Sequence, residues 1–261
     1  MKRWIVALLF CFNAHAVTFS TDNSDLWWDP AEPGYGLNVV QQGDTLFLTL
    51  FTYNAARAPL WLVGTEIKYV GPVGSGYQFG GKWYQTTGSP HTGPYLPTAF
   101  SLREVGTATF TVKSQNSATL VYTIDGVTVT RNLVRQTYKV NNLTGNFLGA
   151  TVGTYGNCLT LNSYSEDIGF VAVAHDPSTN AITITAQQAG GTCTYSGTYE
   201  PTGRLGSISS GLFSCTNGGL AGTFIATEIE GSTLSFSTRI SARGAGQCTF
   251  IGKIGGLRQG P

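Results

Sequence analysis

Short runs of alternating apolar and polar residues, separated by turn residues, recur along most of the chain. The clearest runs are 107–112, 120–124 and 127–134, and Asp125-Gly126 joins the last two. An Asp-Gly loop between alternating runs predicts a tight β-hairpin. No window of helical length shows a 3.6-residue period, so almost no helix is expected after the first sixteen residues. The pattern therefore predicts an all-β protein.

Turn residues divide this pattern into two antiparallel β-meander domains. We expect an N-terminal domain of about seven strands at 17–139, a linker at 140–144 and a second domain at 145–261. Many short strands at even spacing favour barrel-like or sandwich domains, because these leave few open edges. The glycine-rich segment Gly71–Gly81 is predicted to be a loop, followed by a short strand at Lys82–Gln85.

The run Thr45–Tyr53 differs from the others because both of its faces are apolar. Phe47, Phe51 and Tyr53 share one face, while three leucines occupy the other. Apolar residues on both faces are typical of a strand buried from both sides, and we predict this here.

The first sixteen residues have the pattern of a secretory signal peptide. Lys2 and Arg3 precede the apolar run 4–12, and Ala14-His15-Ala16 supplies a small-residue cleavage site. A membrane anchor is the alternative, but the run is about half the length that spans a bilayer. We expect an exported protein, periplasmic or extracellular, that starts at Val17 and has no membrane span after the leader.

The four cysteines that follow the leader all lie in the second half of the chain. They are Cys158, Cys193, Cys215 and Cys248. An even number in an exported chain predicts two disulfides, with three connectivities to choose from. Strand directions favour Cys193–Cys215 with Cys158–Cys248. Zinc is the alternative, but no pair has the close spacing of common structural zinc sites, so no metal is expected.

Charge and motifs exclude several classes of function. Without Lys2 and Arg3, thirteen basic residues face fourteen acidic ones, so the exported chain is near neutral. Such a chain lacks the basic field that attracts phosphates, and nucleic acid is not an expected partner. The sequence has no P-loop, no G-x-G-x-x-G, no H-E-x-x-H and no G-x-S-x-G, so no cofactor is expected.

The stretch Leu26–Gly64 concentrates aromatic, acidic and glycine residues. Its two acids, Asp29 and Glu32, suit glycoside hydrolysis if their carboxyl groups lie about 5 to 10 Å apart. Both also fit an ordinary turn with Pro30. Aromatic faces can instead stack on sugars while nearby polar groups fix the orientation. The predicted ligand-binding residues are Trp27, Trp28, Asp29, Glu32, Tyr35, Asn38, Gln41, Trp61, Trp83 and Tyr84.

The alternative is that these aromatic side chains fill the core. Successive residues in extended chain point to opposite sides, so Trp27 and Trp28 cannot easily both be buried. If one ring packs inward, its neighbour faces outward beside the two acids. We therefore expect a binding surface at 27–38.

The same stretch resembles a motif of secreted proteins from Gram-negative bacteria, W-W-x-P-x-E-x-G-x-G-x-N, followed by Q-G-D and T-Y-x-x-x-x-x-P-x-W-L. The segments Tyr122–Gln136 and Gly197–Cys215 are similar to the same group. Asp29 and Tyr35 depart from its pattern, which has Asn and Trp there. The resemblance implies export and a β architecture, and it brings no activity with it.

Together these observations predict an exported, non-enzymatic binding or surface-interaction protein. The expected partner is a glycan or another small molecule with a flat, apolar face. The alternatives are a carbohydrate-active hydrolase that uses Asp29 and Glu32, and a purely structural envelope or adhesion protein. The sequence leaves the oligomeric state open.

Overall fold

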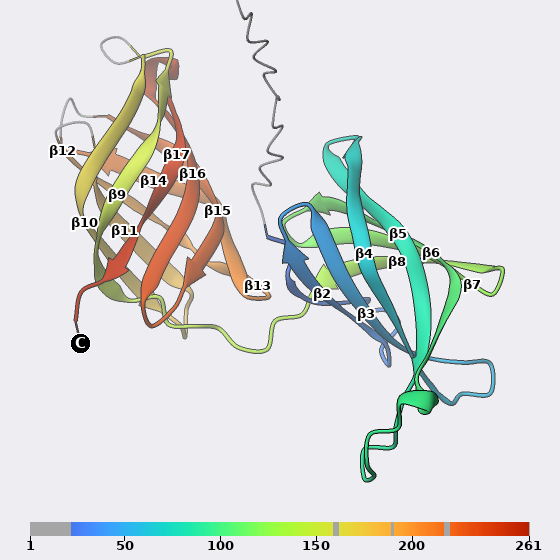
Figure 1. Cartoon of the computed structure of the whole chain (residues 1–261). Helices are drawn as coiled ribbons and strands as arrows, with labels where there is room; N and C mark the ends of the chain where they lie inside the picture. Colours follow the sequence, from blue (N-terminus) through green and yellow to red (C-terminus); the bar gives the residue numbers. More distant parts are fainter. Residues whose placement is uncertain (1–21, 159–161, 189–190, 217–219, 261) are drawn as a thin grey trace, which may run out of the picture.

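A computed structural model describes residues 22–158, 162–188, 191–216 and 220–260. It contains seventeen β-strands and two short 3-10 helices (Figure 1). The prediction of an all-β protein with two barrel-like domains is confirmed. The predicted leader and its cleavage site lie outside the described residues.

The first barrel is a closed antiparallel meander of eight strands. Each strand pairs with the next in sequence, and β1 pairs with β8 to close the ring. A 3-10 helix, Pro97–Ala99, lies in the connection between β5 and β6. The strands are β1 (Asp25–Trp28), β2 (Gly36–Gln42), β3 (Thr45–Tyr53), β4 (Pro59–Val73), β5 (Gly76–Thr87), β6 (Ser101–Ser114), β7 (Ser117–Ile124) and β8 (Val127–Arg135).

The glycine-rich segment that was predicted to be a loop is instead part of a long β4–β5 hairpin. That prediction was wrong because these glycines permit close contact between strands. A Cβ on Gly76 would lie 1.9 Å from the carbonyl oxygen of Val112, and one on Gly81 would lie 2.5 Å from that of Glu66. Glycine inside a strand often marks such an approach of another backbone.

The second barrel has a less regular strand order. Its ring runs β12-β11-β10-β9-β17-β16-β15-β14 and is closed by pairing of β12 with β14, while β13 adds to β14. A 3-10 helix, Ala245–Gln247, precedes β17. The strands are β9 (Gly145–Gly156), β10 (Tyr164–Asp176), β11 (Ala181–Gln188), β12 (Gly191–Thr198), β13 (Glu200–Thr202), β14 (Leu205–Cys215), β15 (Ala221–Gly231), β16 (Ser235–Gly244) and β17 (Thr249–Arg258).

Each barrel has its own apolar core. In the first barrel the inward side chains of the strands fill the interior, with Trp27, Trp83, Phe79 and Phe110 the largest of them. The interior of the first barrel is therefore packed with side chains.

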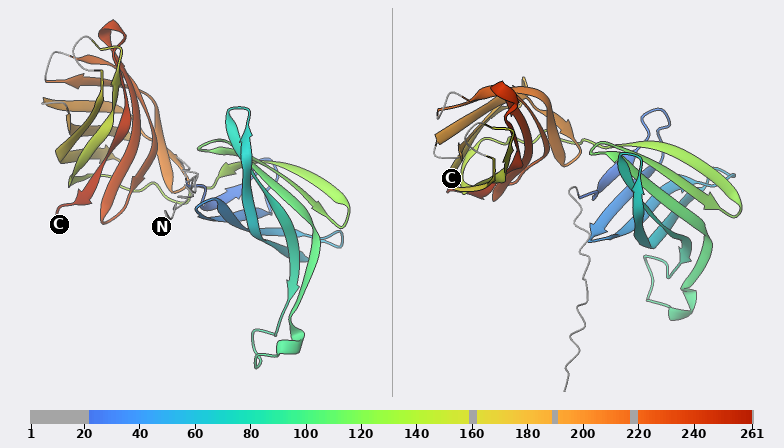
Figure 2. Two further views of the ribbon diagram at one scale, coloured as in Figure 1. Left: turned by 45° about the horizontal axis from the view of Figure 1, so that its top comes forward. Right: turned by 90° about the horizontal axis from the view of Figure 1, so that it is seen from above.

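The chain between β8 and β9, residues 136–144, forms no strand and contains the predicted linker. Figure 2 shows this single connection from two further directions.

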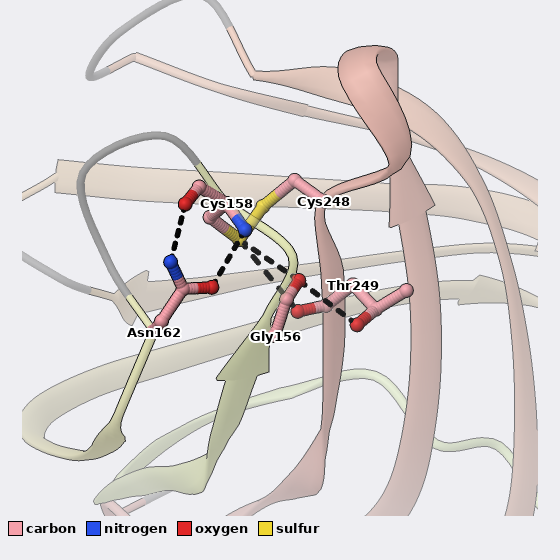
Figure 3. The surroundings of a disulfide bond; sticks show 5 residues. All are labelled: Gly156, Cys158, Asn162, Cys248 and Thr249. Atoms are coloured by element: carbon pink, nitrogen blue, oxygen red, sulfur yellow. Dashed lines mark hydrogen bonds between the residues drawn. A yellow bond between two sulfur atoms is a disulfide. The ribbon is translucent and has the colours of Figure 1, made fainter.

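Two disulfides staple the second barrel, and both predicted pairs are confirmed. Cys158 bonds Cys248 and Cys193 bonds Cys215, with Cα separations of 4.3 and 4.0 Å. Cys193 and Cys215 face each other directly in the β12–β14 ladder. Around the other bond, the amide of Cys158 donates to the side chain of Asn162 (Figure 3).

The two barrels meet at the end of the first barrel that holds Arg135. Gln115 reaches across, donating to Thr202 at 2.8 Å and accepting from the amide of Glu228 at 2.6 Å. The Arg204 guanidinium forms salt bridges with Asp22 at 2.7 Å and, in its own barrel, with Glu230 at 2.9 Å. Hydrogen bonds and an ion pair therefore connect the two barrels at this joint.

Candidate functional site

Strand alternation places the predicted aromatic residues on two different sides of the first barrel. The Trp27 and Trp83 side chains are 0 % exposed. Trp27 donates from Nε1 to the carbonyl oxygen of Asn23 at 3.0 Å and packs edge-on against Phe110, with ring centroids 5.4 Å apart. Trp27 and Trp83 therefore belong to the core and present no surface to a ligand.

Their neighbours in sequence are only partly buried, because adjacent strand residues point to opposite faces. Trp28 is half-buried and pairs with Val134 of β8. Tyr84 is half-buried and pairs with Val63 of β4. We expected one of the two consecutive tryptophans to pack inward and its neighbour to face outward. This arrangement agrees with that expectation.

The strands β2, β3 and β4 lie side by side in the first barrel (Figure 1), and their outer wall carries Trp61 beside the exposed Phe51 and Tyr53. Along one rung of the sheet, Gly36 pairs with Phe51 and Phe51 pairs with Trp61. The rung beside it contains Asn38 and Thr49, which pair with each other. The predicted residues Asn38 and Trp61 thus share this wall, and Tyr84 continues the second rung through Val63.

An open groove of about 560 Å³ follows the first of these rungs toward the free end of the barrel. Phe51, Tyr53 and Trp61 are 51, 56 and 49 % exposed, so each presents about half of its surface to solvent. Gly34 has a φ of +114° and lies close to the Tyr53 ring. The groove residues are Gly34, Thr49, Phe51, Thr52, Tyr53, Pro59, Leu60 and Trp61.

The prediction that Thr45–Tyr53 is buried from both sides was therefore wrong. The leucines of β3 face the core, but Phe47, Phe51 and Tyr53 face solvent. The physical reason is that a barrel is a single closed sheet, and within the described part of the chain no second layer covers this wall. The apolar outer face, which suggested burial, is instead the surface that forms the groove.

The two acidic residues lie on the turn between β1 and β2. Asp29 accepts a hydrogen bond from the amide of Ala31 at 2.9 Å, as turn-forming aspartates do. Glu32 forms a salt bridge with Arg131 of β8, whose guanidinium carbon lies 4.9 Å from the centroid of the Tyr35 ring. Burial, and after it the charge of Asp29, raises the pKa of Tyr35 to about 12. This turn is held against β8 by an ion pair and a cation–π contact.

Sequence reasoning missed Arg131, although the segment that contains it was noted for its resemblance. On β8 the inward face carries Arg131, Leu133 and Arg135, because Arg131 pairs with the buried Leu120. An arginine on the apolar face of an alternating run was the available signal.

Gln41 lies away from the groove, at the end of the barrel that meets the second barrel. Its Oε1 accepts from the amide and the side chain of Asn23 at 2.9 and 2.8 Å. Nearby, the fully buried side chain of Arg135 pairs with Asp25 at 3.1 Å and covers the Trp27 ring. The structure thus divides the predicted site residues among the core, the outer wall, the acidic turn and this joint.

The fold and the groove define the protein as a pair of closed antiparallel β-barrels with an aromatic groove on the first. No family model, curated protein or solved structure matches the chain. The resemblance to the secreted Gram-negative group stays a prediction. Among the described residues, no helix is long and apolar enough to cross a membrane, and no three His, Cys, Asp or Glu side chains gather as a metal site would require.

Proposed function

We propose that the protein is a non-enzymatic binding module that takes a neutral glycan in the groove between β3 and β4. The observation that carries this proposal is the set of three half-exposed rings, Phe51, Tyr53 and Trp61, lining one open groove. Aromatic faces offer a flat apolar surface, which suits the C–H faces of a sugar ring. Small-molecule sites typically combine such surfaces with a few polar groups.

The backbone positions that carry the rings are fixed before any ligand arrives. Phe51 and Trp61 are directly paired residues of neighbouring strands, and Tyr53 pairs with Pro59. A backbone held by a sheet needs no ordering on binding, so less of the interaction energy is lost. A preorganised aromatic groove therefore supports recognition of a rigid ligand.

The lining also supports an uncharged ligand. None of the eight groove residues carries a charge, and the hydroxyls come from Thr49, Thr52 and Tyr53. Asn38 is the cross-strand partner of Thr49 and adds an amide at the edge of the wall. Hydroxyl and amide groups can exchange hydrogen bonds with sugar hydroxyls.

Two features favour binding over glycoside hydrolysis. Hydrolysis requires one carboxyl group to be protonated as a general acid while the other acts as base or nucleophile. Glu32 is instead paired with the Arg131 guanidinium, in a contact that joins the turn to β8. Asp29 accepts a backbone amide of its own turn. Both acids are engaged in holding the turn.

The test compares Trp61→Ala and Phe51→Ala with Phe47→Ala on a glycan array. Phe47 is a matched control because it projects from the same face of β3, is 42 % exposed and does not line the groove. Truncation of a binding hot spot costs 2 kcal/mol or more, so retention by Trp61→Ala should fall at least about tenfold. Phe47→Ala should bind like the unmodified chain.

The thermal midpoint measured on the same variants separates binding from stability. Because the rings are half-exposed, Trp61→Ala should shift the midpoint by only a few degrees, roughly the effect of 1 kcal/mol. Unchanged retention in both groove variants, or no retained glycan for the unmodified chain, would contradict the proposal. Release of reducing sugar that Asp29→Asn with Glu32→Gln abolishes would favour a hydrolase instead.

We also propose that the protein is exported to the periplasm or the medium. The two disulfides support this proposal, because disulfides persist mainly in oxidising compartments. The measurement is the mass of the N-terminal peptide of exported material, which should begin at Val17. An intact Met1 in that material would contradict the predicted cleavage.

A further inference from the structure

The strands β10, β9 and β17 are neighbours in the second barrel (Figure 1), and their outer wall carries a second, separate apolar surface. On it, Phe170, Leu148 and Leu257 form one continuous row and are 60, 51 and 70 % exposed. Ile168, in the next row, is 76 % exposed. Monomers rarely expose large contiguous apolar patches without a function for them.

The pairing registers of the three strands place their outward side chains in straight rows. Each row contains one residue from β10, one from β9 and one from β17. The four rows are Tyr164–Thr154–Ile251, Glu166–Val152–Lys253, Ile168–Ala150–Gly255 and Phe170–Leu148–Leu257. The wall therefore has an acidic residue and three bulky side chains on its β10 side, and a basic residue, a glycine and two bulky side chains on its β17 side.

We propose that this wall binds a second copy of the chain, face to face, about a twofold axis that runs along β9. Such an axis maps β9 onto β9 of the other copy and brings each β10 opposite the other copy's β17. Every row then meets itself with its flanks exchanged, as an isologous interface requires.

The rows are self-complementary under that operation. Glu166 of each copy meets Lys253 of the other, so opposite charges face each other twice. Ile168 meets Gly255, so a projecting side chain meets a position without one. Phe170 meets Leu257, and both are apolar. Two sheets packed in this way keep their strands within about 30° of alignment.

The other twofold axis in the plane of the wall gives a poor match. An axis across the strands at the Ile168 row would place Glu166 against Phe170 of the other copy, and Lys253 against Leu257. A charged group buried against an apolar one without a partner is costly. The order of residues along β10 and β17 therefore selects the axis along β9.

The charged pair is available for this contact. Within one chain Glu166 accepts only a long hydrogen bond from Tyr164, at 3.4 Å. Neither Glu166 nor Lys253 forms a salt bridge with another residue in the part of the chain that the structure describes. Opposed charge pairs of this kind set orientation and suppress wrong partners.

The size of the surface suits a dimer. Six large apolar side chains of the wall are more than half exposed: Tyr164, Ile168, Phe170, Leu148, Leu257 and Ile251. At roughly 100 Å² each they present about 600 Å², close to the ~800 Å² per partner of a standard interface. The first barrel contacts the β13–β15 region through Thr202, Arg204 and Glu228, and the exposed side chains show that the described residues leave this wall uncovered.

Sedimentation velocity on the purified full chain tests the proposal. Over a loading range of about 1 to 300 μM, which covers weak interfaces of this size, the unmodified chain should pass from monomer to dimer. Ile168→Asp should raise the dimer Kd at least tenfold. Leu212→Asp is the matched control, because Leu212 is 68 % exposed on β14, four strands around the ring from β9.

A charge exchange tests the axis itself. Glu166→Lys and Lys253→Glu, made singly, should each raise the Kd, because each places like charges opposite one another twice. The double variant should restore the dimer. Sedimentation as a monomer over the whole range, a dimer insensitive to Ile168→Asp, or a double variant weaker than both single ones would overturn the proposal.

Discussion

The two barrels have the same ring size and each has an apolar core, yet a buried ion pair stabilises one and disulfides stabilise the other. The first contains no cysteine, and one end is filled by the Arg135 side chain, which pairs with Asp25 above the Trp27 ring. The second is cross-linked by two disulfides. One is therefore held by a buried charge and the other by covalent bonds.

This difference has a consequence for how each barrel responds to change. Burial lowers the pKa of Arg135, which records the cost of keeping a guanidinium out of water. A buried ion pair adds little net stability, but loss of one partner is costly because the other charge remains. A disulfide acts mainly on the unfolded chain, so its removal leaves the folded contacts in place. The first barrel is thus sensitive to single polar substitutions, and the second is sensitive to reduction.

The sequence supplies a probe that separates the barrels. Every tryptophan of the chain precedes residue 84, so tryptophan fluorescence reports on the first barrel alone. Far-UV circular dichroism reports on both. Denaturant unfolding followed by the two signals therefore assigns each loss of stability to one barrel.

The largest effect is expected from removing the Cys158–Cys248 bond by replacing both residues with alanine. The bond spans 90 residues, and the chain-entropy model gives about 4 to 5 kcal/mol for a loop of this length. Removing Cys193–Cys215, which spans 22, should cost about 3 kcal/mol. Both losses should appear in circular dichroism and spare the fluorescence transition. Equal losses would show that loop length does not set the contribution.

Arg135→Ala should be the most damaging single substitution in the first barrel, with a loss of about 3 kcal/mol. We place it at the low end of the range for broken buried pairs because Asp25 keeps hydrogen bonds from two backbone amides. Arg131→Ala is the control on the same strand. Its partner Glu32 is largely exposed, so the loss should stay below about 1 kcal/mol. Equal losses in the fluorescence transition would contradict the comparison.

Gly203→Ala should disturb the joint between the barrels by about 1 to 2 kcal/mol, because Gly203 has a φ of +66°, which disfavours residues with a Cβ. That Cβ would also lie 2.1 Å from the Asp25 carboxylate. We expect the fluorescence transition to shift with it. Gly74→Ala, at the exposed tip of the β4–β5 hairpin with a φ of +59° and open space around it, carries the backbone cost without the contact. Equal effects of the two would assign the loss to backbone strain alone.

The smallest effect should be an acid sensitivity confined to the second barrel. His175 is buried, its Nδ1 accepts from the amide of Leu143, and burial lowers its pKa. The unfolded chain binds a proton at this residue below about pH 6.5, and the folded barrel binds it less readily, so stability falls as pH drops through that value. Hydrogen bonds from Ser178 and Thr179 lower the pKa of the adjacent Asp176 to about 2, which keeps it charged throughout.

The measurement for His175 is the circular dichroism midpoint at pH 7.5 and pH 5.5. His175→Asn retains an acceptor for the Leu143 amide and cannot titrate, so its midpoint should vary less with pH than that of the unmodified chain. An equally steep dependence in this variant would assign the acid sensitivity to other groups.

Alternation was the part of the fold that sequence reasoning predicted best. Alternation predicted the β class, the hairpins and the division into two meanders, and the strand directions predicted both disulfide pairs. It gave about seven strands instead of eight in the first domain, because β1 has only four residues, which pair with β2 on one side and β8 on the other. Four residues, three of them apolar, are too few to show the alternation by which the other strands were recognised.

The candidate site was predictable in its residue types and not in its placement. Alternation showed that Trp27 and Trp28 must face opposite sides, but only the closed ring decides which side is inside. The same ambiguity affected β3, where leucines and aromatic residues compete for the core. Phe51 and Tyr53 were therefore not predicted as site residues, although Trp61 was. Arg131 was missed because nothing in the local sequence connects it to Glu32.

The strand order of the second barrel has a consequence for its synthesis. β17 lies between β9 and β16, so the ring cannot close before its last strand has emerged. The first barrel, in contrast, can complete all its ladders once Arg135 is available. Until β17 arrives, β9 and β16 present two unpaired edges, and such edges template pairing with other chains. The incomplete second barrel is thus the folding intermediate most prone to aggregate, and we expect it to need protection from other chains during synthesis.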